Sequence, residues 1–289
     1  MSLLLILEFY EVNIVDSNEI KKHAAVRFRS EYHYAVFEYW RSAKLLQWLA
    51  SAGVNQLGRV LDDGCGGGGM CVSLAEETDR VTGIDLDARF GDAGTRLSRE
   101  KNVSNLAFSQ ADGTALPFGQ ASFDLVISHS VIEHVAEPAE YLREAKRTLR
   151  PGGLMFLQTA PYLSPPGSHL PQLKFPLPLH LMFGRNAAFN MSRWIAKYRG
   201  EWLQNGPDGS SFSVAARQGE VKNDDLLYLV TVSNLRTLIA SAGFHVAREH
   251  FHVSGLAKRC LPHRLASDIP KIPLARDILV TNIEYLLVA

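Results

Sequence analysis

The sequence predicts an α/β fold with a parallel sheet that helices cover on both faces. Short apolar stretches alternate with helical stretches along much of the 289 residues. The first apolar stretch runs into a glycine-rich turn, VLDDGCGGGGM at residues 60–70, and the second contains the acidic sequence GIDLD. Apolar runs of this kind are typical of buried parallel strands, which bind ligands at their carboxyl ends.

The N-terminal part is predicted to contain one long helix. Residues 31–52 place apolar side chains at helical spacing, and Gly53 follows as a stop signal. The apolar run at residues 3–7 is too short for a signal peptide and meets Glu8 at once, so we expect a short strand or a docking arm. No stretch reaches the roughly 20 apolar residues of a membrane span.

The core elements follow in order. Strands are predicted at residues 59–64, 80–87, 106–113, 123–131 and 153–160, with helices over residues 70–77 and 139–149. The segment 161–184 is rich in proline, which excludes a regular helix or a central strand, and an insertion continues to about residue 230. The pattern then resumes with a helix over residues 233–242, a cap at Gly243, a strand over residues 244–251 and a last strand within residues 275–289.

Composition excludes several classes of function. The 30 basic and 30 acidic residues balance, so the charge gives no footprint for binding nucleic acid. The cysteines, Cys65, Cys71 and Cys260, are odd in number and lack paired spacing, which argues against disulfides or a zinc cage. Cys65 and Cys71 are expected to be small buried residues, and this cysteine usage suits a reducing cytoplasm.

The glycine turn and its flanking acids indicate a cofactor that contains adenosine. Gly64, Gly66 and Gly69 satisfy the spacing of a dinucleotide-binding turn, and Asp85 ends the second strand about twenty residues later, where a carboxylate can accept from ribose hydroxyls. Asp62 separates the candidate cofactors, because it would repel the pyrophosphate of NAD but attract a ligand with ammonium and sulfonium groups. Asp112, at the end of the third strand, suits an exocyclic amino group.

The ordered motifs resemble the class I S-adenosylmethionine-dependent methyltransferases. LDDGCGGG is similar to their D-x-G-x-G-x-G motif, with Asp62, Gly64, Gly66 and Gly68 at its fixed positions. GIDLD, QADGTALPF, FDLVISHSVIEHV and LRPGG are similar to later landmarks of the small-molecule branch that includes ubiquinone-biosynthesis enzymes. The resemblance covers residues 59–160 and returns over residues 233–251. It implies a doubly wound Rossmann-like sheet of seven strands, mostly parallel, whose last strand is antiparallel.

The resemblance also implies roles for single residues and segments. The amino-acid part of S-adenosylmethionine would be held by Asp62, Gly64, Gly66 and Gly68, and the product would be S-adenosylhomocysteine. The ribose would be held by Asp85, and the adenine by Leu86, Asp112 and Gly113. The methyl group would lie beside Ser128 and His129. Residues 1–52 would form an arm and helix, 53–160 the cofactor-binding core, 161–230 an α-helical and proline-rich lid for the substrate, and 231–289 the completion of the sheet. Asp63 departs from the family pattern and is expected to face solvent or to meet a basic residue of the N-terminal helix.

Histidines are the candidates for the chemistry. His129 and His134 lie near the end of the fourth strand, and either could act as general base for a hydroxyl acceptor. In the alternative, His134 caps or packs the following helix and His129 is a polar residue of the site wall. Glu133 and His134 could suggest a metal pair, but adjacent residues do not share a helix face, so we expect no metal. His169 and His180 could meet the substrate if the insertion closes over the site.

The apolar insertion points to a small hydrophobic or aromatic acceptor, with O-methylation favoured. Its aromatic and basic residues, at 185–203, could instead contact an anionic membrane surface, or simply pack on the core. Two other functions stay open, namely an NAD-binding oxidoreductase and a member that binds the cofactor without turnover. Methylation of nucleic acid or protein is disfavoured by the neutral charge of the chain and by the absence of an Asn-Pro-Pro-Tyr-like motif.

Overall fold

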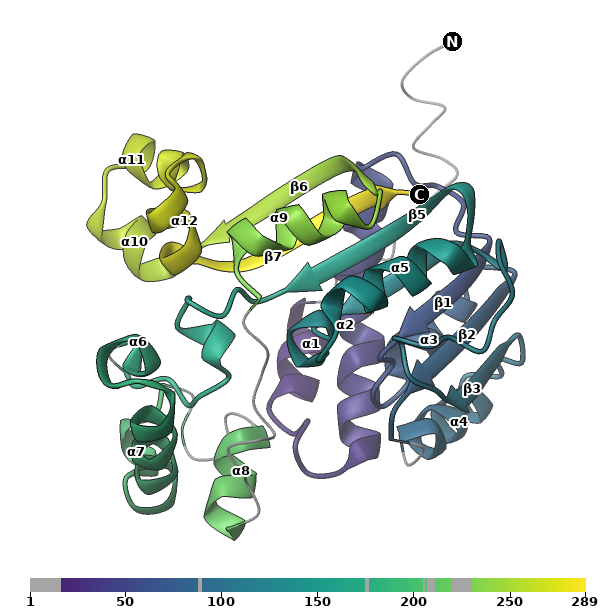
Figure 1. Cartoon of the computed structure of the whole chain (residues 1–289). Coiled ribbons are helices and arrows are strands. Elements are labelled where there is room, and N and C mark those ends of the chain that lie inside the picture. Colours follow the sequence, from purple (N-terminus) through teal and green to yellow (C-terminus); the bar gives the residue numbers. More distant parts are fainter. Residues whose placement is uncertain (1–16, 88–89, 175–176, 205, 207–210, 220–229) are drawn as a thin grey trace. The chain divides into compact units, whose positions relative to one another are not determined.

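The structure is a computed structural model that describes residues 17–87, 90–174, 177–204, 206, 211–219 and 230–289 (Figure 1). Its sheet has seven strands in the order β3-β2-β1-β4-β5-β7-β6. The strands are β1 (Arg59–Asp63), β2 (Arg80–Asp85), β3 (Leu106–Gln110), β4 (Phe123–His129), β5 (Leu149–Thr159), β6 (His245–Val253) and β7 (Val280–Val288). β1 pairs in parallel with β2 and β4, and β2 with β3, whereas β7 is antiparallel to β5 and β6. The predicted mixed sheet with an antiparallel last strand is confirmed.

The helices are α1 (Ser17–Ala24), α2 (Glu31–Ser51), α3 (Gly69–Ala75), α4 (Phe90–Glu100), α5 (Pro138–Thr148), α6 (Leu179–Phe183), α7 (Arg185–Tyr198), α8 (Ser211–Gln218), α9 (Val232–Ser241), α10 (Gly255–Cys260), α11 (His263–Asp268) and α12 (Pro273–Leu279). Short 3₁₀ turns are η1 (Ile132–His134), η2 (Pro166–Ser168), η3 (Gly200–Trp202) and η5 (Ile269–Lys271). Within the described ranges no helix is both long and apolar enough to cross a membrane. The arm expected at residues 3–7 lies outside the described residues.

The chain divides into two compact units, residues 1–113 with 117–127, and residues 114–116 with 128–289. In the first unit, α2 begins after Ser30, whose hydroxyl accepts from the backbone N–H of His33, and it ends before Gly53 at a φ of +85°. A cap of this kind stabilises a helix by about 1 kcal/mol. The buried side of α2 packs on α3 and α4 through a small core that contains Ala35, Val72 and Leu97.

The glycine run serves two structural purposes in this unit. Gly64, Gly66 and Gly68 have positive φ angles of 86°, 49° and 74°, a conformation that side chains disfavour, so they form the sharp turn between β1 and α3. Gly69 has no such angle; a Cβ atom there would lie 1.8 Å from the backbone oxygen of Ala35. Its lack of a side chain therefore lets α2 approach the start of α3.

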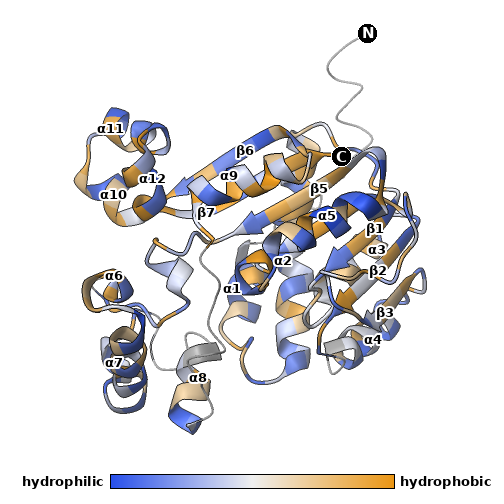
Figure 2. Ribbon diagram, in the orientation of Figure 1, coloured by the Kyte–Doolittle hydropathy of each residue, from blue (hydrophilic) through white to orange (hydrophobic). Residues whose placement is uncertain are grey.

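In the second unit, α5 packs against β5 and α9. It buries Tyr141, Leu142 and Ala145, and its visible side is largely hydrophilic in Figure 2, as expected for an amphipathic helix. β5 begins at Leu149, earlier than the predicted residue 153, because the chain extends directly from the end of α5. The regular antiparallel pairing of β5 with β7 starts at Leu154, after the Pro-Gly-Gly sequence.

The insertion forms a core of its own, contrary to the simple picture of an apolar segment that packs entirely on the sheet. This core consists of Leu170, Leu179, Ala188, Phe189, Ile195, Ala196, Leu203 and Ala216. Another set of its hydrophobic side chains is exposed, namely Leu181, Met182, Phe183, Trp194, Tyr198 and Trp202. Residues 161–178 contain only the 3₁₀ turn η2 as regular structure among their described positions, in agreement with the effect of proline.

The C-terminal region confirms its predicted elements and adds three helices. α9 begins with a capping box between Thr231 and Asn234 and ends before Gly243, which has a φ of +79°. α10, α11 and α12 then fill residues 255–279, where the sequence showed no clear periodicity. Each is short, and α12 begins with Pro273 at its first position, which suits the fixed φ of proline.

Candidate functional site

In the first unit, the end of β1 carries two adjacent buried carboxylates. Asp62 is 2 % exposed, and burial raises its pKa to about 6, although a hydrogen bond from the Cys71 thiol to Oδ2 at 3.2 Å opposes that rise. Asp63 is also 2 % exposed, so the expectation that it faces solvent is wrong. Cys65 and Cys71 are free and buried, as predicted, and Cys260 is free and exposed.

Asp85 connects the end of β2 with the glycine turn. Its Oδ2 accepts from the backbone N–H of Gly66 at 3.0 Å, and its Oδ1 accepts from the N–H of Asp87. The N–H groups of Gly64 and Cys65 both donate to the backbone oxygen of Ile84 at 2.8 Å. These bonds hold the turn beside the strand end that the sequence assigned to a ribose.

Sequence reasoning missed a third buried carboxylate, Glu38 on α2. It is 7 % exposed, its Oε1 pairs with Arg41 at 3.0 Å, and a Cβ atom on Gly66 would lie 3.7 Å from its Oε2. Burial raises the pKa of Glu38 to about 7; Arg41 opposes this rise and the charge of Asp62 adds to it. The only signal in the sequence was an acidic residue on the apolar side of a helix, which does not show what it faces.

The buried Glu38 makes stability depend on pH. Its pKa in the folded protein, about 7, lies above the ordinary 4.5, so its contribution is fully present below pH 4.5 and is lost as pH rises through 7. We expect the free energy of unfolding to fall by about 2–3 kcal/mol from this group between pH 4.5 and 8. The free energy of unfolding, measured by urea at several pH values, should fall less between pH 4.5 and 8 in Glu38→Gln than in the parent protein. The same pH dependence in both proteins would contradict the assignment.

The remaining predicted residues of this unit lie where the motifs place them. Leu86 follows β2 directly and is 68 % exposed, so its side chain is available to a flat apolar ligand. Asp112 is exposed and Gly113 is partly exposed, and both follow the end of β3. Their contacts with a ligand stay predictions.

In the second unit, Ser128 does not offer its side chain to a ligand. The residue has no exposed surface, and its hydroxyl accepts from the Tyr141 hydroxyl at 2.8 Å. His129, the last residue of β4, is partly exposed. The following Ser130 has a φ of +60° and is held by two hydrogen bonds to Gln158, so the chain turns sharply before η1. A predicted contact of Ser128 with the cofactor would have to use its backbone.

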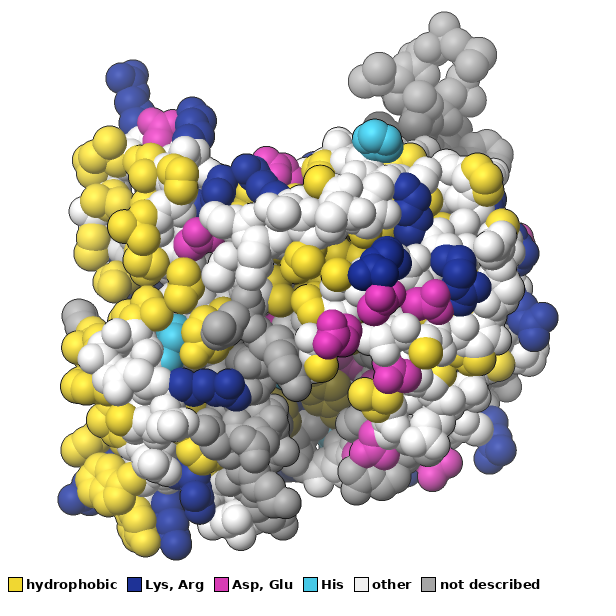
Figure 3. Space-filling model, in the orientation of Figure 1, with side chains coloured by type: hydrophobic (Ala, Val, Ile, Leu, Met, Phe, Trp, Pro, Cys, Tyr) yellow, Lys and Arg dark blue, Asp and Glu magenta, His cyan; other side chains and the backbone are white. Residues whose placement is uncertain are grey.

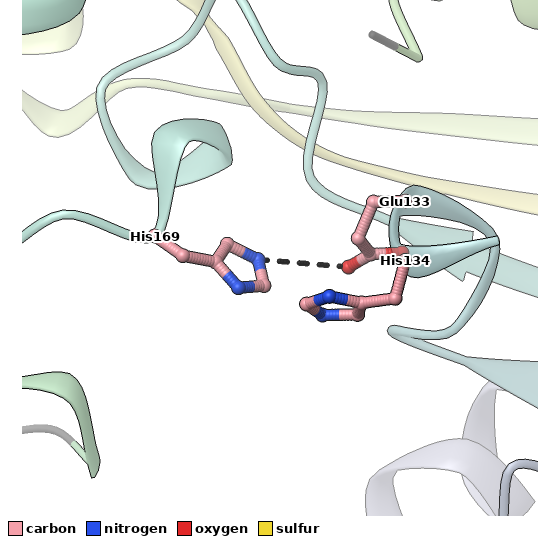
Figure 4. A group of neighbouring side chains, drawn as sticks. All are labelled: Glu133, His134 and His169. Carbon is pink, nitrogen blue, oxygen red and sulfur yellow. Dashed lines mark ion pairs between the residues drawn. The ribbon is translucent and has the colours of Figure 1, made fainter. Parts of the chain in front are cut away.

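Three side chains meet beside η1 (Figure 4). Glu133 is buried, its Oε2 accepts from the Thr159 hydroxyl at 2.8 Å, and burial raises its pKa to about 7. His169, which follows η2, has its Nε2 3.7 Å from Glu133 Oε1. The rings of His134 and His169 make an edge contact with centroids 4.9 Å apart. Desolvation lowers the pKa of both histidines, that of His169 to about 4, so both are neutral at pH 7.

His180 has a role inside the insertion. It is 5 % exposed, its ring packs on Tyr162, and its Nε2 donates to the backbone oxygen of Tyr162 at 2.8 Å. This favours packing over contact with a substrate. Of the two histidines that the sequence placed in the insertion, the structure brings only His169 next to His134.

Residues 61–157 match a family described as a methyltransferase domain. An uncharacterized methyltransferase of Mycobacteroides abscessus is 30 % identical over 241 residues, which are 83 % of this chain and 80 % of that protein. This chain belongs to the class I S-adenosylmethionine-dependent methyltransferases. The family predicted from the motifs is thereby confirmed.

Solved structures show the same fold for this methyltransferase. A S-adenosylmethionine dependent methyltransferase from Mesorhizobium loti is 18 % identical, with a TM-score of 0.51 over 84 % of this chain and 97 % of that one. The [4+2]-cyclase SpnF is 19 % identical, with a TM-score of 0.51 over 86 % of this chain and 82 % of that one. Because a named cyclase shares the fold, the reaction of this methyltransferase has to be argued from its residues.

The residues of the first unit fit the cofactor of the family. At Gly64 and Gly66 the turn leaves partly exposed backbone without side chains, whereas Gly68 is buried. The charge of the buried Asp62 lies close enough to the buried Glu38 to raise the pKa of Glu38. Arg41 pairs with Glu38 and brings one positive charge to the two carboxylates. The negative charge that is left over suits a cationic ligand. An anionic pyrophosphate would increase the repulsion.

Proposed function

We propose that this methyltransferase transfers the methyl group of S-adenosylmethionine to the hydroxyl oxygen of a small hydrophobic or aromatic acceptor. The cofactor assignment rests on the buried carboxylates of Asp62 and Glu38, because their negative charge matches the positive charge of S-adenosylmethionine. When bound, the cofactor supplies an electrophilic methyl group on a sulfonium sulfur. The three free cysteines suit the reducing cytoplasm, in which we propose that the protein acts.

Specific residues would hold the cofactor. Asp62 would attract the ammonium group, the backbone of Gly64, Gly66 and Gly68 would pass beside the amino-acid part, and Asp85 would accept from the ribose hydroxyls. The exposed Leu86 would cover the adenine, with Asp112 accepting from its amino group and Gly113 donating its N–H. Asp85 retains this capacity, because each carboxylate oxygen can accept a second hydrogen bond.

Two histidines are the candidates for orienting and deprotonating the acceptor. His134 is our first choice for the general base, because its pKa is lowered and the neutral ring can take a proton at pH 7. His129, at the end of β4, is the second. Orientation of the acceptor is the larger contribution, about 7–11 kcal/mol for a well-aligned displacement.

The insertion would select the acceptor. Its own core keeps the segment ordered, while Phe183, Trp194 and Trp202 remain about half exposed. Figure 3 shows hydrophobic side chains beside Lys and Arg side chains over α6 and α7. Aromatic residues next to cations also favour peripheral contact with an anionic membrane, which we propose as a second use of this face. Binding to anionic vesicles that persists in a Trp194→Ala, Trp202→Ala double variant would count against that use.

Calorimetry tests the cofactor first. We expect S-adenosylhomocysteine to bind with micromolar affinity and NADH not to bind, since only the former lacks a pyrophosphate. The reverse result would favour an oxidoreductase. Binding without methyl transfer to any of a panel of hydrophobic hydroxylated acceptors would favour a member without turnover.

A substitution tests the base. We expect His134→Ala to lower the turnover of S-adenosylmethionine about 10²–10⁴-fold and to leave the affinity for S-adenosylhomocysteine within about threefold. The same measurement on His129→Ala shows which histidine acts. Equal losses of turnover and of affinity in the His134 variant would indicate a structural role instead.

A further inference from the structure

The cluster at η1 contains three metal-ligating side chains from distant parts of the chain. Glu133 and His134 are adjacent in η1, and His169 follows η2 in the insertion. Ligand atoms from the three residues all lie within 4.8 Å of one another. Figure 4 shows the side chains pointing toward one another. The sequence alone offered an adjacent Glu–His pair without a further ligand, and the fold supplies that ligand.

Glu133 provides a second, independent observation. Its side chain is only 3 % exposed, and its Oε1 has no hydrogen-bond partner among the described residues. That oxygen is the one nearest to His169, at 3.7 Å, which is too long for a hydrogen bond. A buried carboxylate oxygen without a donor is costly, and a bound cation would satisfy it.

We propose that Glu133, His134 and His169 bind one divalent cation of the zinc type. Ligands at about 2.1 Å from a tetrahedral zinc ion lie about 3.4 Å apart, close to the observed 3.7 Å between Oε1 and Nε2. Two imidazoles and one carboxylate form a ligand set that zinc and similar transition metals accept. Thr159 serves as the outer partner that orients the carboxylate through its other oxygen.

Three protein ligands leave one coordination position open. Sites of this kind bind a water molecule or another oxygen ligand, and the cation lowers the pKa of a hydroxyl bound to it. Deprotonation of the acceptor is the task given above to a general base, so for catalysis the inference rests on the proposed function. His134 would then act as a ligand of the cation, and the cation would promote loss of the proton in place of the free histidine. The binding of the metal itself does not depend on the proposed function.

A second cluster serves as an internal comparison. His250 and His252 on β6 flank Glu284 on β7. Glu284 Oε2 is hydrogen-bonded to His250 Nδ1 at 3.0 Å, and its Oε1 lies 3.2 Å from His252 Nε2, within ion-pairing distance. The two histidine side chains are 51 % and 41 % exposed. This arrangement is explained by ordinary ion pairing at the surface. It has to be removed in the test, because exposed histidines also bind zinc weakly.

The experiment titrates Zn²⁺ and Co²⁺ into the full chain without a tag, after treatment with a chelator. The background variant carries His250→Ala and His252→Ala. Added to it are Glu133→Gln, His169→Ala or, as the matched control, His263→Ala, which removes an exposed histidine from α11 outside both clusters. Metal affinity comes from calorimetry, ligand geometry from the visible spectrum of Co²⁺, and folding from thermal unfolding without metal.

We expect one Zn²⁺ per chain in the background and in the His263 variant. Glu133→Gln and His169→Ala should each weaken binding about tenfold or more, remove the visible Co²⁺ bands and remove the rise in melting temperature caused by zinc. Binding that is absent from the background, or equal in all four proteins, would overturn the proposal. S-adenosylhomocysteine is titrated into the same samples, so that a failed metal site is distinguished from a failed cofactor assignment.

Discussion

Gly69→Ala is expected to lower the free energy of unfolding by about 3 kcal/mol or more, because the added Cβ would lie 1.8 Å from the backbone oxygen of Ala35. A backbone oxygen within α2 cannot rotate away as a side chain could. The helix would have to shift as a body, which would disturb the buried contacts of Ala35 with Val72 and Leu97. Thermal and urea unfolding measure the effect.

Gly255→Ala is the matched control. Gly255 is likewise the first residue of a helix, α10, but a Cβ atom there would meet nothing within 4 Å. Alanine favours helices over glycine, so this variant should be as stable as the parent protein or slightly more stable. If both variants lost the same stability, the effect would be one of backbone conformation, and the tight approach of α2 would be refuted.

Asp85→Ala is expected to weaken the binding of S-adenosylhomocysteine about 5- to 150-fold, equivalent to about 1–3 kcal/mol. Two losses contribute. The ribose hydroxyls would lose their acceptor, and the Gly66 N–H, now bonded to Oδ2 at 3.0 Å, would lose the bond that holds the glycine turn. Calorimetry on the folded variant measures the affinity.

Asp124→Ala separates these losses from a general loss of stability. Asp124 also accepts a backbone N–H bond, from Arg59 at 2.8 Å, but it lies near the start of β4, whereas Asp85 ends β2. Parallel strands place these positions at opposite edges of the sheet. We expect this control to lose stability and to keep its affinity. An unchanged affinity in Asp85→Ala would show that the ribose is held elsewhere.

The order of the elements could be predicted because its signals are local. Apolar runs for β1 to β5, the helical spacing of residues 31–51 and the caps at Gly53 and Gly243 each act within a few neighbouring residues. The predicted cofactor motif likewise follows from adjacent residues, with Asp85 in the next strand. Residues 255–279 were not predicted as helices, since α10, α11 and α12 are too short to show a period.

The sequence by itself thus determined the sheet, the glycine turn and the class of cofactor. Only the tertiary structure showed that Glu38 is buried beside Asp62, that Gly69 makes room for α2, and that His169 lies near Glu133. The physical reason is the same in the three cases. A pattern of residues shows which side of an element is buried, but the partner across the interface comes from a distant segment, and its charge or size decides the chemistry.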